Sequence, residues 1–214
     1  MSTAARVTRK CSVCGKESEH RVLMSSNTFG GGPDLDTRPA EMMRSTMCYW
    51  VQECPHCGYI SEDISDETSV GKEYLDSEEY IKCNNLKLPT DLANKFYKYY
   101  LLNIKDENPK DAFLAALHTA WICDDKSDEI NACNCRLLAL EQLEILLQEE
   151  PSEMALVVKA DLLRRTGQFN QLINEYENKQ FDDKLLNKIV DFEILKAKEA
   201  DTSCYRVEDV ESQQ

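Results

Sequence analysis

The chain has 214 residues, of which 42% are hydrophobic and 30% are charged, and its formal net charge is −14. This composition indicates a soluble globular protein, long enough to bury a core as one domain or as two small ones. No apolar run approaches the ~20 residues that span a bilayer, and residues 1–10 lack the apolar core of a signal peptide. We therefore expect a cytoplasmic protein that makes no membrane contact.

The negative charge is unevenly distributed along the sequence. Residues 1–60 contain seven Lys or Arg and six Asp or Glu, whereas the remaining 154 residues contain 18 and 33. A strongly acidic body repels the phosphate backbone of DNA or RNA. We therefore do not expect this protein to bind nucleic acids.

Two cysteine pairs near the front of the chain, Cys11/Cys14 and Cys54/Cys57, are each followed directly by a glycine. Two intervening residues let the chain fold back so that both sulfurs face one point, and glycine accepts the positive φ that closes such a turn. Two Cys-x-x-Cys-Gly turns on either side of a 39-residue insert are typical of a four-thiolate zinc site. The sequence thus predicts Zn²⁺ at about 2.3 Å from each sulfur. A mononuclear iron site has the same spacing and is the less favoured alternative.

The segments around the cysteine pairs predict a zinc ribbon over residues 1–62. Residues 20–26 are expected to form a short strand that leaves the first turn. Residues 47–53 alternate in the manner of a second strand, which leads into the second turn. Between them, three glycines and two prolines within residues 30–39 exclude a strand or a helix.

The rest of the chain predicts helices. Residues 63–77 are acidic and poor in large apolar side chains, which is typical of a linker. From residue 78 to residue 200 the apolar residues recur at helical spacing. The clearest stripe is Phe169, Leu172, Ile173 and Tyr176. The remaining residues, 201–214, are expected to form a flexible tail.

Individual boundaries within this region can also be predicted. A long helix is expected over residues 128–149, and Pro151 is expected in the first turn of the next one. Gly167 should end that helix, and a last helix should cover residues 182–200. The segments 120–127 and 160–167 align at a shift of 40 residues, each as a helix end followed by a turn. This weak repeat favours stacked helical hairpins like those of tetratricopeptide proteins, although their usual period is 34. The predicted fold class is α+β.

The chain resembles the bacterial domain-of-unknown-function family 2225. The resemblance rests on the first cysteine turn, on Cys54-Pro55-His56-Cys57-Gly58-Tyr59, and on Arg164-Arg165-Thr166-Gly167-Gln168-Phe169 in the helical part. It implies zinc binding and a cytosolic setting, and it implies no established activity.

The second cysteine turn also allows a redox interpretation. Cys-Pro-His-Cys is the tetrapeptide of strongly oxidising thiol oxidoreductases, in which a helix N-terminus lowers the pKa of the thiol. Those proteins place the motif between a strand and a helix of a βαβ unit, and no such context is predicted here. A thiol redox protein or sensor that uses Cys54 and Cys57 remains the alternative hypothesis.

The other cysteines and the histidines give weaker signals. Cys133 and Cys135 would lie about 200° apart on a helix, so they cannot both face one metal ion. Most cysteines outside the two turns are expected to be inert: Cys48, Cys83, Cys123, Cys133, Cys135 and Cys204. His20 and His56 flank the metal turns, whereas His118 has the spacing of a core residue.

The long loop that precedes the second cysteine turn is a candidate recognition element. Long loops inside small domains are frequently functional. Its charged residues are Asp34, Asp36, Arg38, Glu41 and Arg44. A simpler interpretation is a solvated connection in which these charges pair with one another. We expect a non-enzymatic interaction protein, with a structural zinc site and a helical surface that binds a protein partner.

Overall fold

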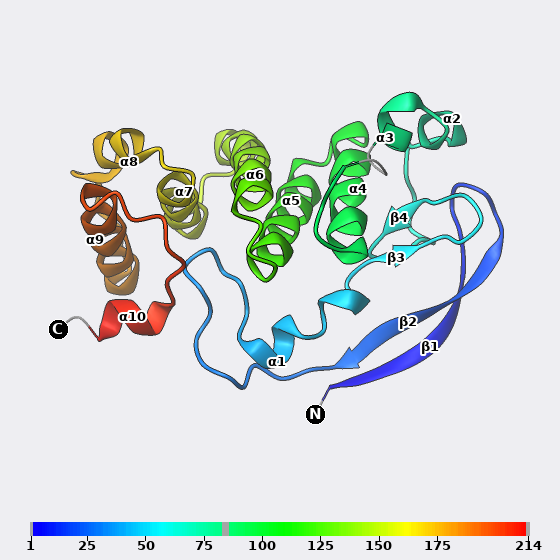
Figure 1. Cartoon of the computed structure of the whole chain (residues 1–214), viewed down its shortest axis with the longest axis horizontal. Coiled ribbons are helices and arrows are strands. Elements are labelled where there is room, and N and C mark those ends of the chain that lie inside the picture. The colour runs from blue at the N-terminus through cyan, green and yellow to red at the C-terminus, as the bar shows by residue number, and fades with distance from the viewer. Residues whose placement is uncertain (1, 83–85, 213–214) are drawn as a thin grey trace.

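A computed structural model describes residues 2–82 and 86–212 of the chain. Two β-hairpins, with two short helical segments between them, form its front part, and helices follow to the end (Figure 1). Strands β1 (Thr3–Lys10) and β2 (Glu17–Ser25) pair antiparallel, and the short strands β3 (Gln52–Glu53) and β4 (Ile60–Ser61) form the second hairpin. The predicted α+β class, with short strands before a helical region, is confirmed.

The front half differs from the prediction in two strands. Strand β1 was not expected, because the polar residues in its sequence hide the alternation that marks a strand. The expected strand over residues 47–53 is wrong for most of its length. Met47–Tyr49 forms a 3₁₀ helix, η1, after the short helix α1 (Glu41–Arg44). The indole of Trp50 donates to Thr46 Oγ1 at 3.0 Å, which favours the helical turn over an extended chain.

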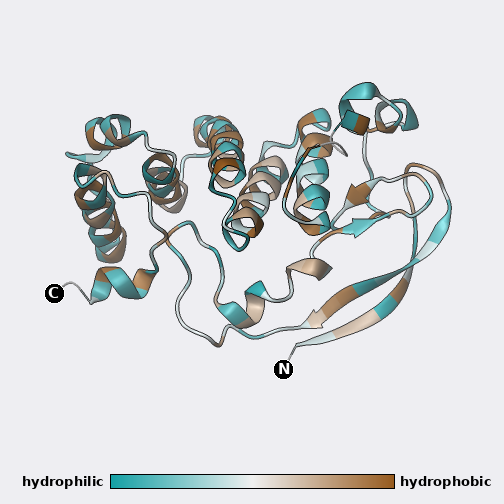
Figure 2. Cartoon of the chain, viewed as in Figure 1, coloured by the Kyte–Doolittle hydropathy of each residue, from teal (hydrophilic) through white to brown (hydrophobic). Residues whose placement is uncertain are grey.

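Side by side, the larger helices form a row (Figure 1). They are α4 (Asp91–Lys105), α5 (Pro109–Asp124), α6 (Glu129–Glu149), α7 (Glu153–Arg165), α8 (Phe169–Tyr176) and α9 (Lys184–Lys198). Hydrophobic and hydrophilic residues alternate around these helices (Figure 2), as expected when one side packs and the other meets water. The apolar stripe of α8 buries Leu172 and Tyr176 as predicted.

Helix starts follow standard capping chemistry. Side-chain oxygens accept from backbone amides at the starts of five helices: Thr90, Asn108, Asp128, Ser152 and Asp183. Each cap satisfies a backbone N–H that has no partner within its helix. Because Ser152 caps α7, Pro151 lies just before the helix and not in its first turn.

Four helices end in the same way. A residue with positive φ closes the turn, and the next N–H reaches back five residues to a helix carbonyl. The turn residues are Glu107, Ser127, Gly167 and Ala200. The ends of α5 and α7 are therefore equivalent at the 40-residue shift seen in the sequence, with Asp128 N bonded to Cys123 O and Gln168 N to Leu163 O.

Residues 63–77, expected as a linker, are folded onto the body. They contain helix α2 (Lys72–Leu75), and α3 (Glu78–Lys82) follows. The side chains of Ile64, Val70 and Leu75 are buried in the same apolar cluster as the helices. Three apolar residues among many acidic ones are enough to hold the segment against the body.

The expected flexible tail is also ordered over residues 201–212. Buried Arg164 donates to the carbonyls of Asp201 and Ser203 at 3.0 and 2.8 Å. The ring of Tyr205 packs edge-on against Phe192, and helix α10 (Val207–Glu211) ends this part. The polar composition of residues 201–212 gives no sign of this order, because Arg164 lies more than 30 residues earlier in the sequence.

Candidate metal centre and apolar groove

Each cysteine turn closes one of the two hairpins, and the two turns have the same backbone geometry. The amide of the first cysteine donates to the carbonyl five residues later, at 2.9 Å for Cys11 and 2.8 Å for Cys54. The following glycine then donates back to the first cysteine at 2.9 Å in both turns. Gly15 and Gly58 have φ of 70° and 75°, the left-handed region that glycine adopts without strain.

This geometry brings the four predicted sulfurs together. The Sγ atoms of Cys11, Cys14, Cys54 and Cys57 all lie within 4.8 Å of one another. The Cys11–Cys57 and Cys14–Cys54 sulfur pairs are both 3.7 Å apart. A tetrahedral ion about 2.3 Å from each of four sulfurs separates them by about 3.8 Å. The donor set therefore fits one tetrahedral metal ion held by both turns.

The surroundings of the sulfurs suit thiolate ligands. Burial raises the pKa of the Cys11 and Cys57 thiols, although backbone amides also donate to both sulfurs. The Lys16 amide lowers the pKa of Cys14 to about 7. A bound divalent ion deprotonates such thiols, because its charge is the largest in the site.

Neither histidine near the turns belongs to this cluster. His20 Nε2 lies 2.8 Å from Ser18 Oγ, and His56 Nε2 lies 3.3 Å from the carbonyl of Glu17. His118 packs among aromatic rings, as expected of a core histidine, and burial lowers its pKa to about 3. The imidazole of His118 is therefore neutral at physiological pH.

The two cysteine turns are attached to the segment that precedes α4. The amide of Ser12 donates to the carbonyl of Ile64 at 2.9 Å, and Arg9 pairs with Asp63 at 2.6 Å. The hydroxyl of Tyr80 donates to the carbonyl of Gly58 at 2.9 Å. Both turns thus contact the segment between the hairpins and α4.

Among the remaining cysteines, only some have the expected burial. Cys123 and Cys135 are buried, Cys133 is half-buried, and Cys48 and Cys204 are exposed. Cys83 lies outside the described residues. None of the five described thiols belongs to the four-sulfur cluster.

The candidate recognition loop does not lie free in solvent. It crosses the molecule below the helices and returns to α1 (Figure 1). Asp34, Asp36 and Arg38 are at most 4% exposed, whereas Glu41 is exposed. Arg44 donates to Asp34 at 3.0 Å, so one pair forms within the loop as the simpler interpretation expected.

The other two buried charges of the loop pair with the helices. Asp36 accepts from the indole of Trp121 at 2.7 Å, and it lies 3.7 Å from both Arg136 and Arg165. Arg38 pairs with Asp125 at 2.5 Å. Local sequence gives no signal for these partners, because they lie more than 80 residues away.

The buried pairs hold a strained turn. Thr37 lies between Asp36 and Arg38 and has a φ of 71°, which is unfavourable for a residue with a Cβ atom. Its amide donates to the carbonyl of Asp34 at 2.9 Å. Such a conformation persists only where the surroundings fix it, and it is common at ligand-binding sites.

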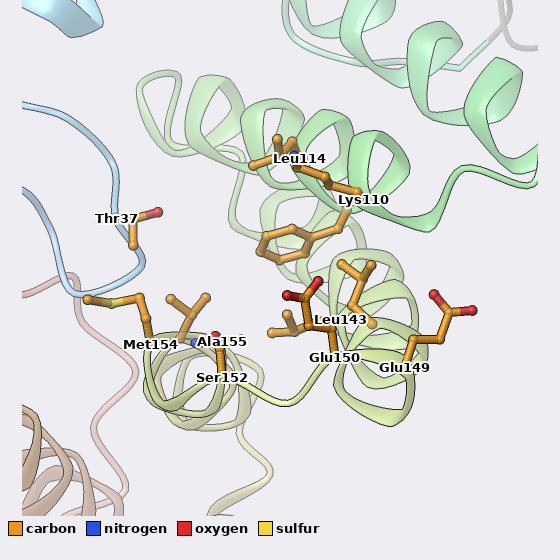
Figure 3. Close-up of a pocket in the computed structure, with 12 residues that line it drawn as sticks. Thr37, Lys110, Leu114, Leu143, Glu149, Glu150, Ser152, Met154 and Ala155 are labelled. Atoms are coloured by element: carbon orange, nitrogen blue, oxygen red, sulfur yellow. Dashed lines mark hydrogen bonds between the residues drawn. The ribbon is translucent and has the colours of Figure 1, made fainter. Parts of the chain in front are cut away.

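Beside Thr37 lies an apolar groove with a volume of about 630 Å³. Figure 3 shows Thr37 and Met154 on one side of it, and Leu143, Glu150 and Lys110 on the other. Its residues come from α5, α6, α7 and the loop: Thr37, Lys110, Phe113, Leu114, Leu143, Leu146, Glu149, Glu150, Ser152, Met154, Ala155 and Val158. Sequence reasoning missed this groove, since apolar residues at helical spacing predict core packing and not which of them remain open.

Comparisons with known proteins give one match. No curated protein and no solved structure is significantly similar to the chain. Among the described residues, no helix combines the length and the apolar character needed to cross a lipid bilayer. The family model described as "Uncharacterized protein conserved in bacteria (DUF2225)" matches residues 5–201, which include both cysteine turns and the arginine pair of α7. The chain therefore belongs to the DUF2225 family, as its cysteine turns and its Arg-Arg-Thr-Gly-Gln-Phe segment predict.

Proposed function

We propose that this protein is a cytoplasmic, non-enzymatic interaction module in which a structural Zn²⁺ fixes the hairpins and the helices bind a protein partner. The observation that carries the proposal is the apolar groove between α5, α6 and α7. An apolar floor with a polar rim is the arrangement by which helical proteins capture partner segments. The described lining of the groove contains no histidine, the residue used most often as a general base.

The proposed zinc site has a structural role. Four thiolates complete the tetrahedral coordination of Zn²⁺ and leave no open position for a substrate. Metal binding in such sites contributes folding energy directly. Cys54 is 1% exposed, and its turn lies between two strands with no helix N-terminus, an arrangement unlike that of the oxidoreductases that share its tetrapeptide.

A site-specific crosslink tests the interaction proposal in cells. A photoreactive benzoylphenylalanine replaces Met154, which lines the groove and is 53% exposed. The same group at Ile130, 77% exposed on α6 outside the groove lining, is the control. We expect a discrete protein adduct from position 154 that is absent from position 130.

A second substitution shows whether the adduct depends on the groove. Ala155→Trp fills the groove beside position 154 without changing charge. We expect it to abolish the adduct. Equal adducts from both positions, or an adduct that survives Ala155→Trp, would contradict the proposal.

A further inference from the structure

The end of the groove formed by α6 carries an unbalanced negative charge. Glu149 is the last residue of α6 and Glu150 follows it, and both side chains are exposed. Within the described residues neither carboxylate has an ion-pair partner, whereas Glu144 on the same helix pairs with Lys159 at 3.1 Å. Among the described residues that line the groove, Lys110 is the single cation, so the rim remains net negative.

The helix itself adds to this potential. The last carbonyl groups of a helix carry partial negative charge, so carboxylates at that position are unfavourable. Helix α6 has 21 residues and places Glu149 at this end. A cation bound there would relieve the repulsion between the two carboxylates and the helix terminus.

On the opposite wall of the groove, an apolar side chain lies beside a backbone turn that buried charges hold in place. Met154 and Thr37 form this wall (Figure 3), and Thr37 is fixed by the buried pairs of Asp36 and Arg38. A backbone turn that is already fixed reduces the entropy lost when a ligand binds. Apolar side chains of a ligand therefore fit between this wall and Leu143, with a cationic group toward Glu149 and Glu150.

We infer that the groove binds a partner segment that joins at least two apolar side chains to a neighbouring Lys or Arg, whose cation pairs with Glu149 and Glu150. This inference rests on the proposed function and specifies the chemistry of the partner. The loop from Asp34 to Arg38 acts as a fixed lip of the groove. The acidic composition of the helical region also favours a positively charged ligand, because it steers cationic segments toward this face.

Peptide selection against the full-length, metal-loaded protein tests the inference. A phage-displayed library of random 12-residue peptides is the probe, and selection is repeated on the Ala155→Trp variant. We expect the peptides that bind only the unmodified protein to contain paired apolar residues next to Lys or Arg. Their affinities are then measured by fluorescence anisotropy.

Charge reversal distinguishes ion pairs with Glu149 and Glu150 from the effect of the protein's net charge. Glu149→Arg with Glu150→Arg is expected to weaken the selected peptides by about three- to tenfold, as for two exposed ion pairs. The control, Glu73→Arg with Asp76→Arg at α2, changes the net charge equally and lies far from the groove (Figure 1). It is expected to change affinity less than twofold.

The possible outcomes distinguish this inference from the proposal beneath it. The inference would be overturned if the groove-dependent peptides lacked a basic residue and their affinities did not change on charge reversal. The proposed interaction function would then still stand. An equal loss in both charge variants would overturn the local pairing. No peptide that depends on the open groove would contradict both the inference and the proposed function.

Discussion

Asp36 is the residue on which the loop depends most. Its carboxylate accepts from Trp121 and from the Arg38 amide, the latter at 3.2 Å, and faces the guanidinium groups of Arg136 and Arg165. Removing one partner from a buried charge cluster leaves the others without compensation. The buried arginines, not local sequence, thus determine where the loop lies.

Asp36→Asn tests this role. The amide keeps the shape but removes the charge, so we expect the free energy of unfolding to fall by about 3 kcal/mol. Urea denaturation followed by circular dichroism measures it. Glu41→Gln, an exposed neutralisation in the same part of the chain, is the control and should change stability by less than about 0.5 kcal/mol. Equal effects would show that Asp36 is not an anchor.

Glu193 provides a second prediction at this scale. It is fully buried beside Arg164, which also pairs with Asp161 at 3.0 Å, and burial raises the pKa of Glu193 to about 8. One guanidinium therefore faces two buried carboxyl groups, each with an oxygen that has no hydrogen-bond partner within the described residues. A proton held by this pair would balance the charge.

The pH dependence follows from the raised pKa. Between the unfolded pKa of about 4.5 and the folded value of about 8, the folded protein binds more protons than the unfolded one, so its stability falls as the pH rises. Glu193→Gln removes this group, and we expect the difference in unfolding free energy between mutant and unmodified protein to vary across pH 5–8. A difference that stays constant over this window would contradict the assignment.

At the scale of elements, the helix ends allow the clearest prediction of a change in stability. Three of the four equivalent turns place Glu107, Ser127 or Ala200 at positive φ, and only Gly167 has the residue that such a turn favours. A side chain in this conformation costs about 1–2 kcal/mol, partly offset by the greater chain entropy of an unfolded glycine.

Ser127→Gly should therefore stabilise the protein by about 0.5–1 kcal/mol. Gly167→Ala, at the equivalent end of α7, should destabilise it by a similar amount. Thermal unfolding at fixed protein and zinc concentrations measures both. Changes of the same sign in the two variants would contradict the equivalence of the turns.

For the whole molecule, we expect the first hairpin to depend on the proposed metal more than the helices do. No residue of β1 or β2 is fully buried, and a two-stranded hairpin is only marginally stable by itself. The helices have their own buried core and caps. We expect a chelator to abolish hydrogen-exchange protection in β1 and β2 while α5 and α6 remain protected. Loss of protection throughout the chain would show that the metal supports the entire fold.

Sequence could predict features that depend on short spacings. The cysteine turns need only two intervening residues and a glycine, and the stripe of α8 and the ends at Gly167 follow from local chemistry. The 3₁₀ turn at Met47 and the order of the tail follow instead from distant contacts. The same holds for the groove, since the buried pairs of Asp36 and Arg38 bring together residues from both halves of the chain.

The most direct test of the metal centre combines elemental mass spectrometry of the purified protein with alkylation of its native thiols. We expect one zinc per chain, with Cys11, Cys14, Cys54 and Cys57 protected until a chelator is added. Exposed Cys48 serves as the internal control and should be alkylated at once. A protein without metal, in which Cys54 is alkylated rapidly at neutral pH, would contradict the structural zinc site and favour thiol redox chemistry.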